Sequence, residues 1–187
     1  MKYLIVGLGN PGKKYARNRH NIGFLSLDSL SGSFSVEITK KYKQSLIATL
    51  EWNQKTLVLM KPLTFMNASG DMVQKAVATY KIPLSHLIVI YDDIDFPLGR
   101  IKIRKGGSSG GHKGVQSIID SLQNGNFIRV RIGINSEYKK DLPLEEFVLN
   151  DFNKPEVPIL QQVLKQIPDV ISRILDHSVD KAMNEFN

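Results

Sequence analysis

Short apolar runs that end in glycine or aspartate constrain the fold of this chain more than any other feature. Residues 2–7 (KYLIVG) lead into a glycine-rich turn, and residues 87–91 (LIVIY) lead into a group of aspartates. Runs of this length, rich in Val and Ile and closed by turn residues, are typical of buried strands. Segments with helical spacing lie between such runs. This alternation predicts an α/β fold in which helices cover a sheet.

Periodicity predicts the other elements. Further strands are expected over 34–39, 45–52, 56–61, 100–105 and 128–134. Helices are expected over 21–30, 67–80 and 112–122, and one or two over 157–187 with Pro168 as a candidate break. The polar residues 137–151 predict a mobile loop or flap. The early strands favour antiparallel pairing, so we expect a single three-layer α/β/α domain over residues 1–187, on a twisted mixed sheet.

Charge is divided unevenly along the chain. Residues 1–136 carry 19 basic and 8 acidic side chains, a net +11, whereas residues 137–187 carry 6 and 10, a net −4. A basic body indicates an anionic partner, which is nucleic acid, a phosphate-rich ligand or an anionic membrane. The absence of cysteine excludes disulfides and thiol nucleophiles. No apolar run is long enough to span a bilayer and no cleavable signal is visible, so we expect a cytoplasmic protein.

Two glycine motifs match known patterns, but their surroundings favour neither function. Residues 7–12 (GLGNPG) follow a strand as a dinucleotide fingerprint would. The residues after them are polar, and Pro11 removes a backbone donor that a pyrophosphate would use. Residues 107–111 (GSSGG) fit a nucleophile elbow around Ser109, but the strand before them is basic and half exposed. A nucleotide-cofactor enzyme and a serine hydrolase are therefore both disfavoured.

Polar residues that follow the predicted strands are the candidates for chemistry. His20, in RNRHN, is either a general base near neutral pH or a helix-capping residue. Asp92, Asp93 and Asp95 follow a buried strand, at the sheet edge where α/β folds bind ligands. One carboxylate could orient a histidine; alternatively, the three could bind Mg²⁺ or cap the loop.

Amides and cations form two more groups. Asn10 and Asn67 lie where a loop meets an element, so each could donate to a carbonyl or oxyanion or could cap a turn. The cations that flank the glycine loop are Lys102, Arg104, Lys105, Arg129 and Arg131. Alternation places Lys102 and Arg104 on one face of their strand. It likewise places Arg129 and Arg131 on one face of theirs. These faces form either a track for phosphates or an ordinary solvated surface.

Five longer motifs together resemble those of bacterial peptidyl-tRNA hydrolases. They are 4–24 (LIVGLGNPGKKYARNRHNIGF), 61–70 (KPLTFMNASG), 91–99 (YDDIDFPLG), 106–119 (GGSSGGHKGVQSII) and 129–134 (RVRIGI), in the family's order and near its spacing. The resemblance covers essentially the whole chain. It implies a monomeric, cytoplasmic α/β/α hydrolase without metal or organic cofactor. Such an enzyme cleaves the ester between the peptide and the 3′-terminal ribose of peptidyl-tRNA, binding the acceptor stem and 3′-CCA end, and recycles tRNA after premature release from ribosomes.

The resemblance also implies a role for individual residues. His20 would activate water, and Asp92 would orient the ring of His20. The substrate-binding positions would be Asn10, Tyr15, Phe65, Asn67 and Lys113, and the tRNA phosphate positions Lys102, Arg104 and Arg131. Lys113 departs from the family, which commonly has Asn there; it could contact a tRNA phosphate or pair with a carboxylate. A non-catalytic RNA-binding module is the alternative, against which the retained histidine, aspartate and asparagines argue.

Overall fold

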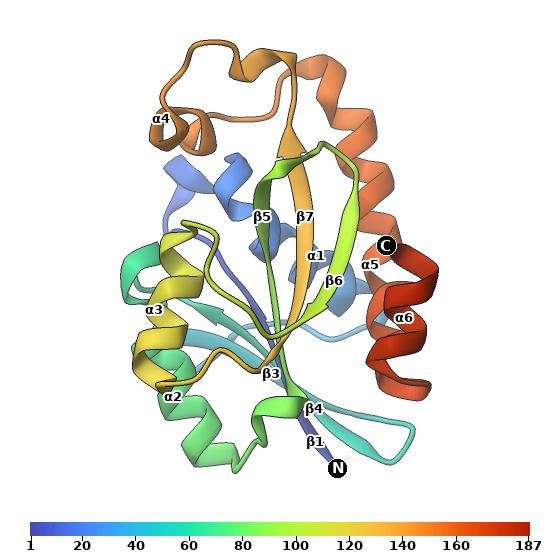
Figure 1. Ribbon diagram of the computed structural model, residues 1–187. Helices are drawn as coiled ribbons and strands as arrows, with labels where there is room; N and C mark the ends of the chain where they lie inside the picture. Colours follow the sequence, from blue (N-terminus) through green and yellow to red (C-terminus); the bar gives the residue numbers. More distant parts are fainter.

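A seven-stranded mixed sheet is the middle layer of the computed structural model, which describes residues 1–187 (Figure 1). The strands are β1 (Lys2–Gly7), β2 (Lys40–Lys41), β3 (Ser45–Trp52), β4 (Lys55–Pro62), β5 (Leu87–Pro97), β6 (Ile101–Lys105) and β7 (Ile128–Asn135). They lie in the order β2-β3-β4-β1-β5-β7-β6. β1 pairs in parallel with β4 and β5, and β5 with β7, whereas the remaining neighbours are antiparallel.

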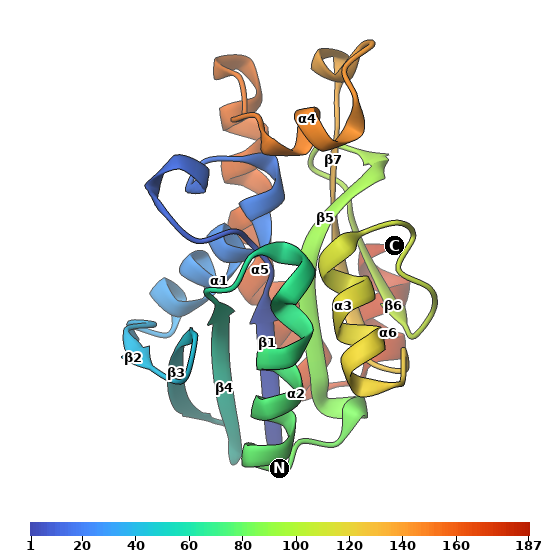
Figure 2. The ribbon, with the colours of Figure 1, turned by 90° about the vertical axis from the view of Figure 1, so that its left-hand side faces the viewer.

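Helices cover both faces of this sheet (Figures 1 and 2). They are α1 (Ile22–Ser33), α2 (Ser69–Tyr80), α3 (Lys113–Leu122), α4 (Leu144–Leu149), α5 (Val157–Asp176) and α6 (Val179–Phe186). α2 and α3 pack on one face over a buried apolar cluster, while α1, α5 and α6 pack on the other face over a second cluster. None of the helices is long and apolar enough to cross a membrane. The prediction of a three-layer α/β/α arrangement on a mixed sheet is confirmed.

Two glycines bring α1 close to the ends of the central strands. A Cβ atom on Gly7 would lie 2.2 Å from the carbonyl oxygen of Gly23, and one on Gly23 would lie 2.4 Å from the carbonyl oxygen of Ile90. Real Cβ contacts are never this short, so a side chain at either position would push α1 away from the sheet. The close approach places the residues just before α1, including His20, beside the carboxyl ends of β1 and β5.

The strand predicted over 34–39 does not form. α1 extends to Ser33, directly before this segment, and residues 36–39 pair with no strand. Only β2, which follows them, joins the sheet. Phe34 and Val36 pack against the core, and Ile38 is buried. The alternation that suggested a strand therefore reflects burial of every second side chain, without a neighbouring strand to pair with.

Pro168 does not break the C-terminal helix. It lies inside α5, which runs on for eight residues beyond it to Asp176. A proline leaves the carbonyl group four residues earlier without its helical N–H donor. That carbonyl belongs to Leu164, and the hydroxyl of Ser29 in α1 donates to it at 2.7 Å. The neighbouring helix thus supplies the missing hydrogen bond, and α5 remains continuous.

Two further segments are more ordered than predicted. The aspartates expected after a strand lie within β5, because β7 pairs with it through Asp93 and again at Pro97, after a bulge. The expected loop at 137–151 contains α4, whose Phe147 is buried with its ring 4.3 Å from the guanidinium of Arg19. Through the buried ring of Phe147, this polar segment packs against the rest of the protein.

Candidate active site

A cavity of about 280 Å³ lies between α4, the start of α2 and the glycine loop Gly106–Gly111 that precedes α3. It opens at the carboxyl ends of β1 and β5. The lining residues that matter for chemistry are Asn10, His20, Phe65, Asn67, Asp92, His112 and Lys113. The fold thus brings together residues from distant parts of the chain, including six of the sequence-predicted site residues.

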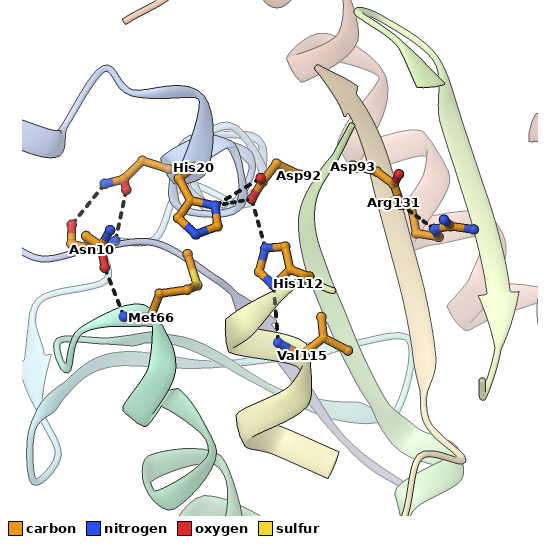
Figure 3. Close-up of polar contacts among 9 residues, drawn as sticks. Asn10, His20, Met66, Asp92, Asp93, His112, Val115 and Arg131 are labelled. Carbon is orange, nitrogen blue, oxygen red and sulfur yellow. Dashed lines mark hydrogen bonds and ion pairs between the residues drawn. The ribbon is translucent and has the colours of Figure 1, made fainter. Parts of the chain in front are cut away.

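The carboxylate of Asp92 accepts hydrogen bonds from two histidines (Figure 3). His20 Nδ1 lies 2.8 and 2.9 Å from its two oxygens, and His112 Nε2 lies 3.0 Å from Oδ1. Asp92 is only 4% exposed, and burial alone would raise its pKa. The hydrogen bonds from His20 and His112, and the positive charge that these rings carry when protonated, outweigh burial and hold the pKa far below its usual range. Asp92 is therefore an anionic acceptor, and both rings donate to it.

These contacts fix the tautomer of each neutral ring. His20 donates from Nδ1, so its Nε2 carries a lone pair, and this nitrogen has no hydrogen-bond partner in the cavity wall. His112 is the N-cap of α3, where its Nδ1 accepts from Val115 N–H at 3.2 Å. Its Nε2 must then hold the ring proton. Of the two histidines, only His20 offers a free basic nitrogen.

The pKa of His20 is raised above its usual 6.5. Burial lowers the pKa, but the negative charge of Asp92 and its hydrogen bond to the ring raise it by more. The positive charge of Lys113 opposes this rise. The result is a base whose proton affinity is set by one carboxylate and moderated by one nearby cation.

The turn that carries His20 is tied down by the residue before it. Arg19 is almost fully buried, and its guanidinium pairs with Glu156 at 2.5 Å. It also donates to the carbonyl groups of Asn150 and Asp151, the second of these being the closer contact. A guanidinium that bonds a carboxylate and two backbone carbonyl groups restrains the segments that it joins. Arg19 therefore joins the turn of His20 to the chain that follows α4.

Asn10 is held so that one end of its amide remains available. Its Oδ1 accepts from Met66 N–H at 2.9 Å, which leaves Nδ2 without a partner in the cavity wall. Its backbone is fixed by Asn21, whose side chain accepts from Asn10 N at 2.8 Å and donates to Asn10 O at 3.0 Å. The amide thus presents a donor to the cavity, as an oxyanion or carbonyl would need.

The other predicted substrate-binding residues occupy different surroundings. Phe65 and Asn67 are exposed, lie at the 3₁₀ turn that precedes α2, and line the cavity. Tyr15 lies in the 3₁₀ turn Lys13–Tyr15 and is not part of the cavity wall. A substrate longer than the cavity could still reach it, and its role in substrate binding stays a prediction.

Sequence reasoning missed two residues of this site, His112 and Asn21. The histidine is 20 residues from Asp92, and no spacing rule connects them, although its position just before a helix signals a capping role. Asn21 follows His20 directly, and the sequence pattern predicts only that it begins a helix. Its reciprocal hydrogen bonds with Asn10 depend on a return of the chain that the sequence pattern does not specify.

The donor set does not suit a metal ion. His20, Asp92 and His112 place three ligand atoms within 4.8 Å of one another. However, His112 uses Nδ1 as an acceptor, so binding a metal through Nε2 would require the ring to lose both protons. Asp93 pairs with Arg131 at 2.5 Å, and Asp95 is largely exposed. The Mg²⁺ alternative is therefore disfavoured by how these carboxylates are engaged.

The two disfavoured glycine motifs also lack the expected surroundings. No α-helix begins within residues 7–12, because α1 begins only at Ile22. Ser109 lines the cavity, but its hydroxyl contacts only the backbone N–H of Gly111, at 3.3 Å. A nucleophilic serine needs a base within hydrogen-bond reach, and no imidazole contacts this one.

The predicted phosphate-binding cations share one face of the sheet. β6 pairs with β7 so that Lys102 lies opposite Arg131 and Arg104 opposite Arg129. Arg131 is mostly buried and paired with Asp93, while Lys102 Nζ lies 4.6 Å from the ring of Phe96. Arg104 is exposed, which makes it the most accessible of the three predicted phosphate contacts.

Arg129 is a structural part of the glycine loop. It is 2% exposed, and its guanidinium donates to the carbonyl groups of Gly107, Ser108 and Gly125. A guanidinium offers five donors in a fixed plane, which suits several carbonyls at once. Arg129 therefore holds the loop that leads to His112 and does not face a phosphate.

Lys113, the residue after His112, makes one of the contacts considered for it. Its ammonium group pairs with the carboxylate of Glu145 in α4 at 2.5 Å. Both side chains line the mouth of the cavity.

Comparison with known proteins places this geometry in context. The family model for peptidyl-tRNA hydrolases matches residues 4–187. A peptidyl-tRNA hydrolase of Thermoanaerobacter sp. (strain X514) is 43% identical over 185 residues, which cover 99% of each chain. One from Thermodesulfovibrio yellowstonii is 44% identical over 187 residues, or 98% of each chain. A crystal structure of peptidyl-tRNA hydrolase from Acinetobacter baumannii is 29% identical, with a TM-score of 0.90 over 99% of this chain and 94% of that one.

Proposed function

Because the chain belongs to the peptidyl-tRNA hydrolase family, we propose that His20 is the general base of its hydrolytic reaction and that Asp92 orients it. The substrate is peptidyl-tRNA, and the bond cleaved is the ester between the peptide and the 3′-terminal ribose. One observation carries this assignment. His20 directs Nδ1 to a buried carboxylate and leaves Nε2 free at the wall of the cavity.

The reaction begins with a water molecule bound between His20 and the ester. His20 Nε2 removes a proton from this water as its oxygen attacks the ester carbonyl carbon. The imidazolium that forms is stabilised by Asp92, which remains an anion. General-base assistance of this kind contributes about 10²–10⁴-fold to the rate.

The attack produces a tetrahedral intermediate with a negative oxygen. Asn10 Nδ2 is the donor best situated to stabilise it, because Met66 N–H already occupies the other end of this amide. One such donor is worth about 10²–10³-fold in rate. When the intermediate collapses, the ribose 3′ oxygen leaves and takes the proton from His20. The peptide acid and the tRNA are released, and no covalent enzyme intermediate is required.

The remaining predicted residues bind the substrate around this centre. Phe65 and Asn67 face the cavity, which receives the 3′-terminal nucleoside and the first peptide residue. Lys102 and Arg104 lie on the basic face of β6 and contact phosphates of the acceptor stem. Arg131 joins them there by exchanging its pairing with Asp93 for a phosphate. The monomeric state, the cytoplasmic location and the single domain expected from the sequence stay predictions.

The test is release of an N-acetylated, radiolabelled aminoacyl group from tRNA by wild-type protein and by His20→Ala. We expect His20→Ala to lose at least about 10²-fold in kcat while its affinity for the tRNA persists. His177→Ala is the matched control, because His177 is exposed at the end of α5 and does not line the cavity. Near-normal turnover by His20→Ala would refute the assignment of the base. Binding without release by the wild-type protein would favour a non-catalytic RNA-binding module.

A further inference from the structure

Two opposite charges meet across the mouth of the cavity. Lys113 is the first residue of α3, and Glu145 lies in the first turn of α4. Their charged atoms are 2.5 Å apart, and no other ion pair or side-chain hydrogen bond joins the two helices. Both residues line the same cavity as His20 and Asn10. The contact therefore lies in the wall of the cavity in which the substrate is proposed to bind.

The stability of the fold does not explain this pair. The two side chains are 62% and 77% exposed, and exposed ion pairs contribute little to the free energy of unfolding. In addition, a lysine in the first turn of a helix opposes the helix dipole, which favours acidic residues there. α3 has no acidic residue in its first turn that would compensate. Lys113 thus occupies a position that costs α3 stability and gains little from Glu145.

We propose that Lys113 is a binding site for a phosphodiester group of the RNA 3′ end, and that Glu145 occupies this site in the free protein. This inference rests on the function proposed above. The scissile ester is on the 3′ oxygen of the last ribose, and the nearest phosphodiester is attached to the 5′ oxygen of that same ribose. An ammonium group is a compact charge with three donors, and it can bind either a phosphate or a carboxylate.

Exchange of the carboxylate for a phosphate requires little movement. Phe147 anchors α4 in a buried contact with Arg19, whereas the side chain of Glu145, two residues earlier in the same short helix, is largely exposed. Rotation of the Glu145 side chain therefore frees Lys113 without moving α4. Lys113 is also near enough to His20 to lower the pKa of that base, which places the proposed phosphate site beside the reacting atoms.

The experiment measures binding of the RNA trinucleotide CCA over a range of salt concentrations. Glu145→Gln should bind it several-fold more tightly than the wild-type protein, because the competing carboxylate is lost. Lys113→Asn should bind it several-fold more weakly, with a slope of log K against log salt that is smaller by about 0.7, the value for one phosphate of a single strand. Glu146→Gln and Lys165→Asn are the matched controls for the change in charge, since both residues are exposed and unpaired.

Exchange of the two charges distinguishes a phosphate-binding site from an ion pair that only holds α3 and α4 together. The double variant Lys113→Glu with Glu145→Lys restores an ion pair of the same geometry but removes the cation from position 113. It should bind CCA as weakly as Lys113→Asn or more weakly. Recovery of wild-type affinity by this variant would overturn the proposal, as would unchanged affinity and salt slope in Lys113→Asn, or absence of binding by both the wild-type protein and Glu145→Gln.

The outcome is separable from that of the proposed function. Release of the acetylated aminoacyl group is measured on the same preparations, with His20→Ala as the inactive reference. If His20→Ala abolishes release while Lys113→Asn leaves both CCA binding and KM unchanged, only the phosphate site is refuted. If all variants bind CCA as expected but the wild-type protein releases nothing, the hydrolytic assignment fails and the binding site stands.

Discussion

His112 donates through Nε2 to the same oxygen of Asp92 that His20 approaches, at 3.0 and 2.8 Å respectively. A single buried carboxylate therefore receives two imidazole N–H groups. One ring is also committed to capping α3. In the proposed mechanism, His112 positions the carboxylate, and His20 keeps a free ring nitrogen for the attacking water.

Replacement of Asp92 by Asn should reduce kcat by about 10²-fold or more. The variant loses the anion that raises the pKa of His20, and its amide N–H can donate to Nδ1, which moves the ring proton to Nε2. The measurement is the pH profile of kcat, whose acid limb should move to lower pH. Asp95→Asn is the control, since its carboxylate is 68% exposed. Equal losses in the two variants would exclude a specific role for Asp92.

Substitutions of His112 should separate its capping role from its contact with Asp92. Asn is a favoured N-cap residue but is too short to reach Asp92, so His112→Asn should keep α3 stable, whereas His112→Ala should lose about 0.5–2 kcal/mol. Both should lower kcat by a similar factor, about 10–100-fold, because a hydrogen bond to a charged group is worth about 1.5–3 kcal/mol. Denaturant unfolding and kcat are measured together. Normal kcat in His112→Asn would show that the residue only caps the helix.

The pH dependence of activity should follow the raised pKa of His20. The neutral ring is the active form, so kcat/KM should rise with pH through a pKa above 6.5. Lys113→Asn removes a charge that lowers this pKa, and the acid limb should therefore move to higher pH. Kinetics between pH 5 and 9 test both statements. A limb that moves to lower pH in Lys113→Asn would contradict them.

The same shift predicts how stability depends on pH. Because the folded pKa of His20 exceeds the unfolded value, protonation of this ring stabilises the fold fully below pH 6.5, and the contribution is lost as pH rises through the folded pKa. The measurement is the free energy of unfolding of wild-type protein and of His20→Gln at pH 6 and pH 8.5. The wild-type advantage should be larger at pH 6. A constant difference would mean that the pKa is not raised.

Loss of the Ser29 hydroxyl should destabilise the protein only while Pro168 is present. Ser29→Ala leaves the carbonyl of Leu164 without a donor, at a cost of about 1 kcal/mol. Pro168→Ala restores the helical N–H donor to the same carbonyl, so Ser29→Ala should cost clearly less in that background. Denaturant unfolding of the four proteins gives the coupling energy. Additive effects would show that the hydroxyl does not replace the helical bond.

The sequence predicts most of the layers and many strands, because the periodicity of apolar residues is a local property. It fails where two segments distant in the chain determine the outcome. The alternation of Phe34, Val36 and Ile38 reflects packing against the core, which looks the same in sequence as a strand. Likewise, Pro168 is tolerated because of a hydroxyl on another helix.

Within the site, the sequence identifies residues that belong to a distinctive motif. It does not identify residues whose part depends on a tertiary contact. His20 and Asp92 stand in motifs that resemble a family, and the structure brings them together. The part played by His112 depends on a contact across 20 residues. The basic track was predicted from alternation, yet the pairing of Arg131 with Asp93 and the burial of Arg129 depend on tertiary structure.

The order of the strands has a consequence for how the chain is made. β1 is synthesised first but lies in the middle of the sheet, between β4 and β5. On a ribosome, both edges of β1 are paired only after β4 and β5, which lie within residues 55–97, have emerged from the exit tunnel. His20 and Asp92 are 72 residues apart and meet only after that pairing. The appearance of activity during synthesis would therefore report completion of the central sheet, and a slow step there would leave an exposed apolar strand open to aggregation.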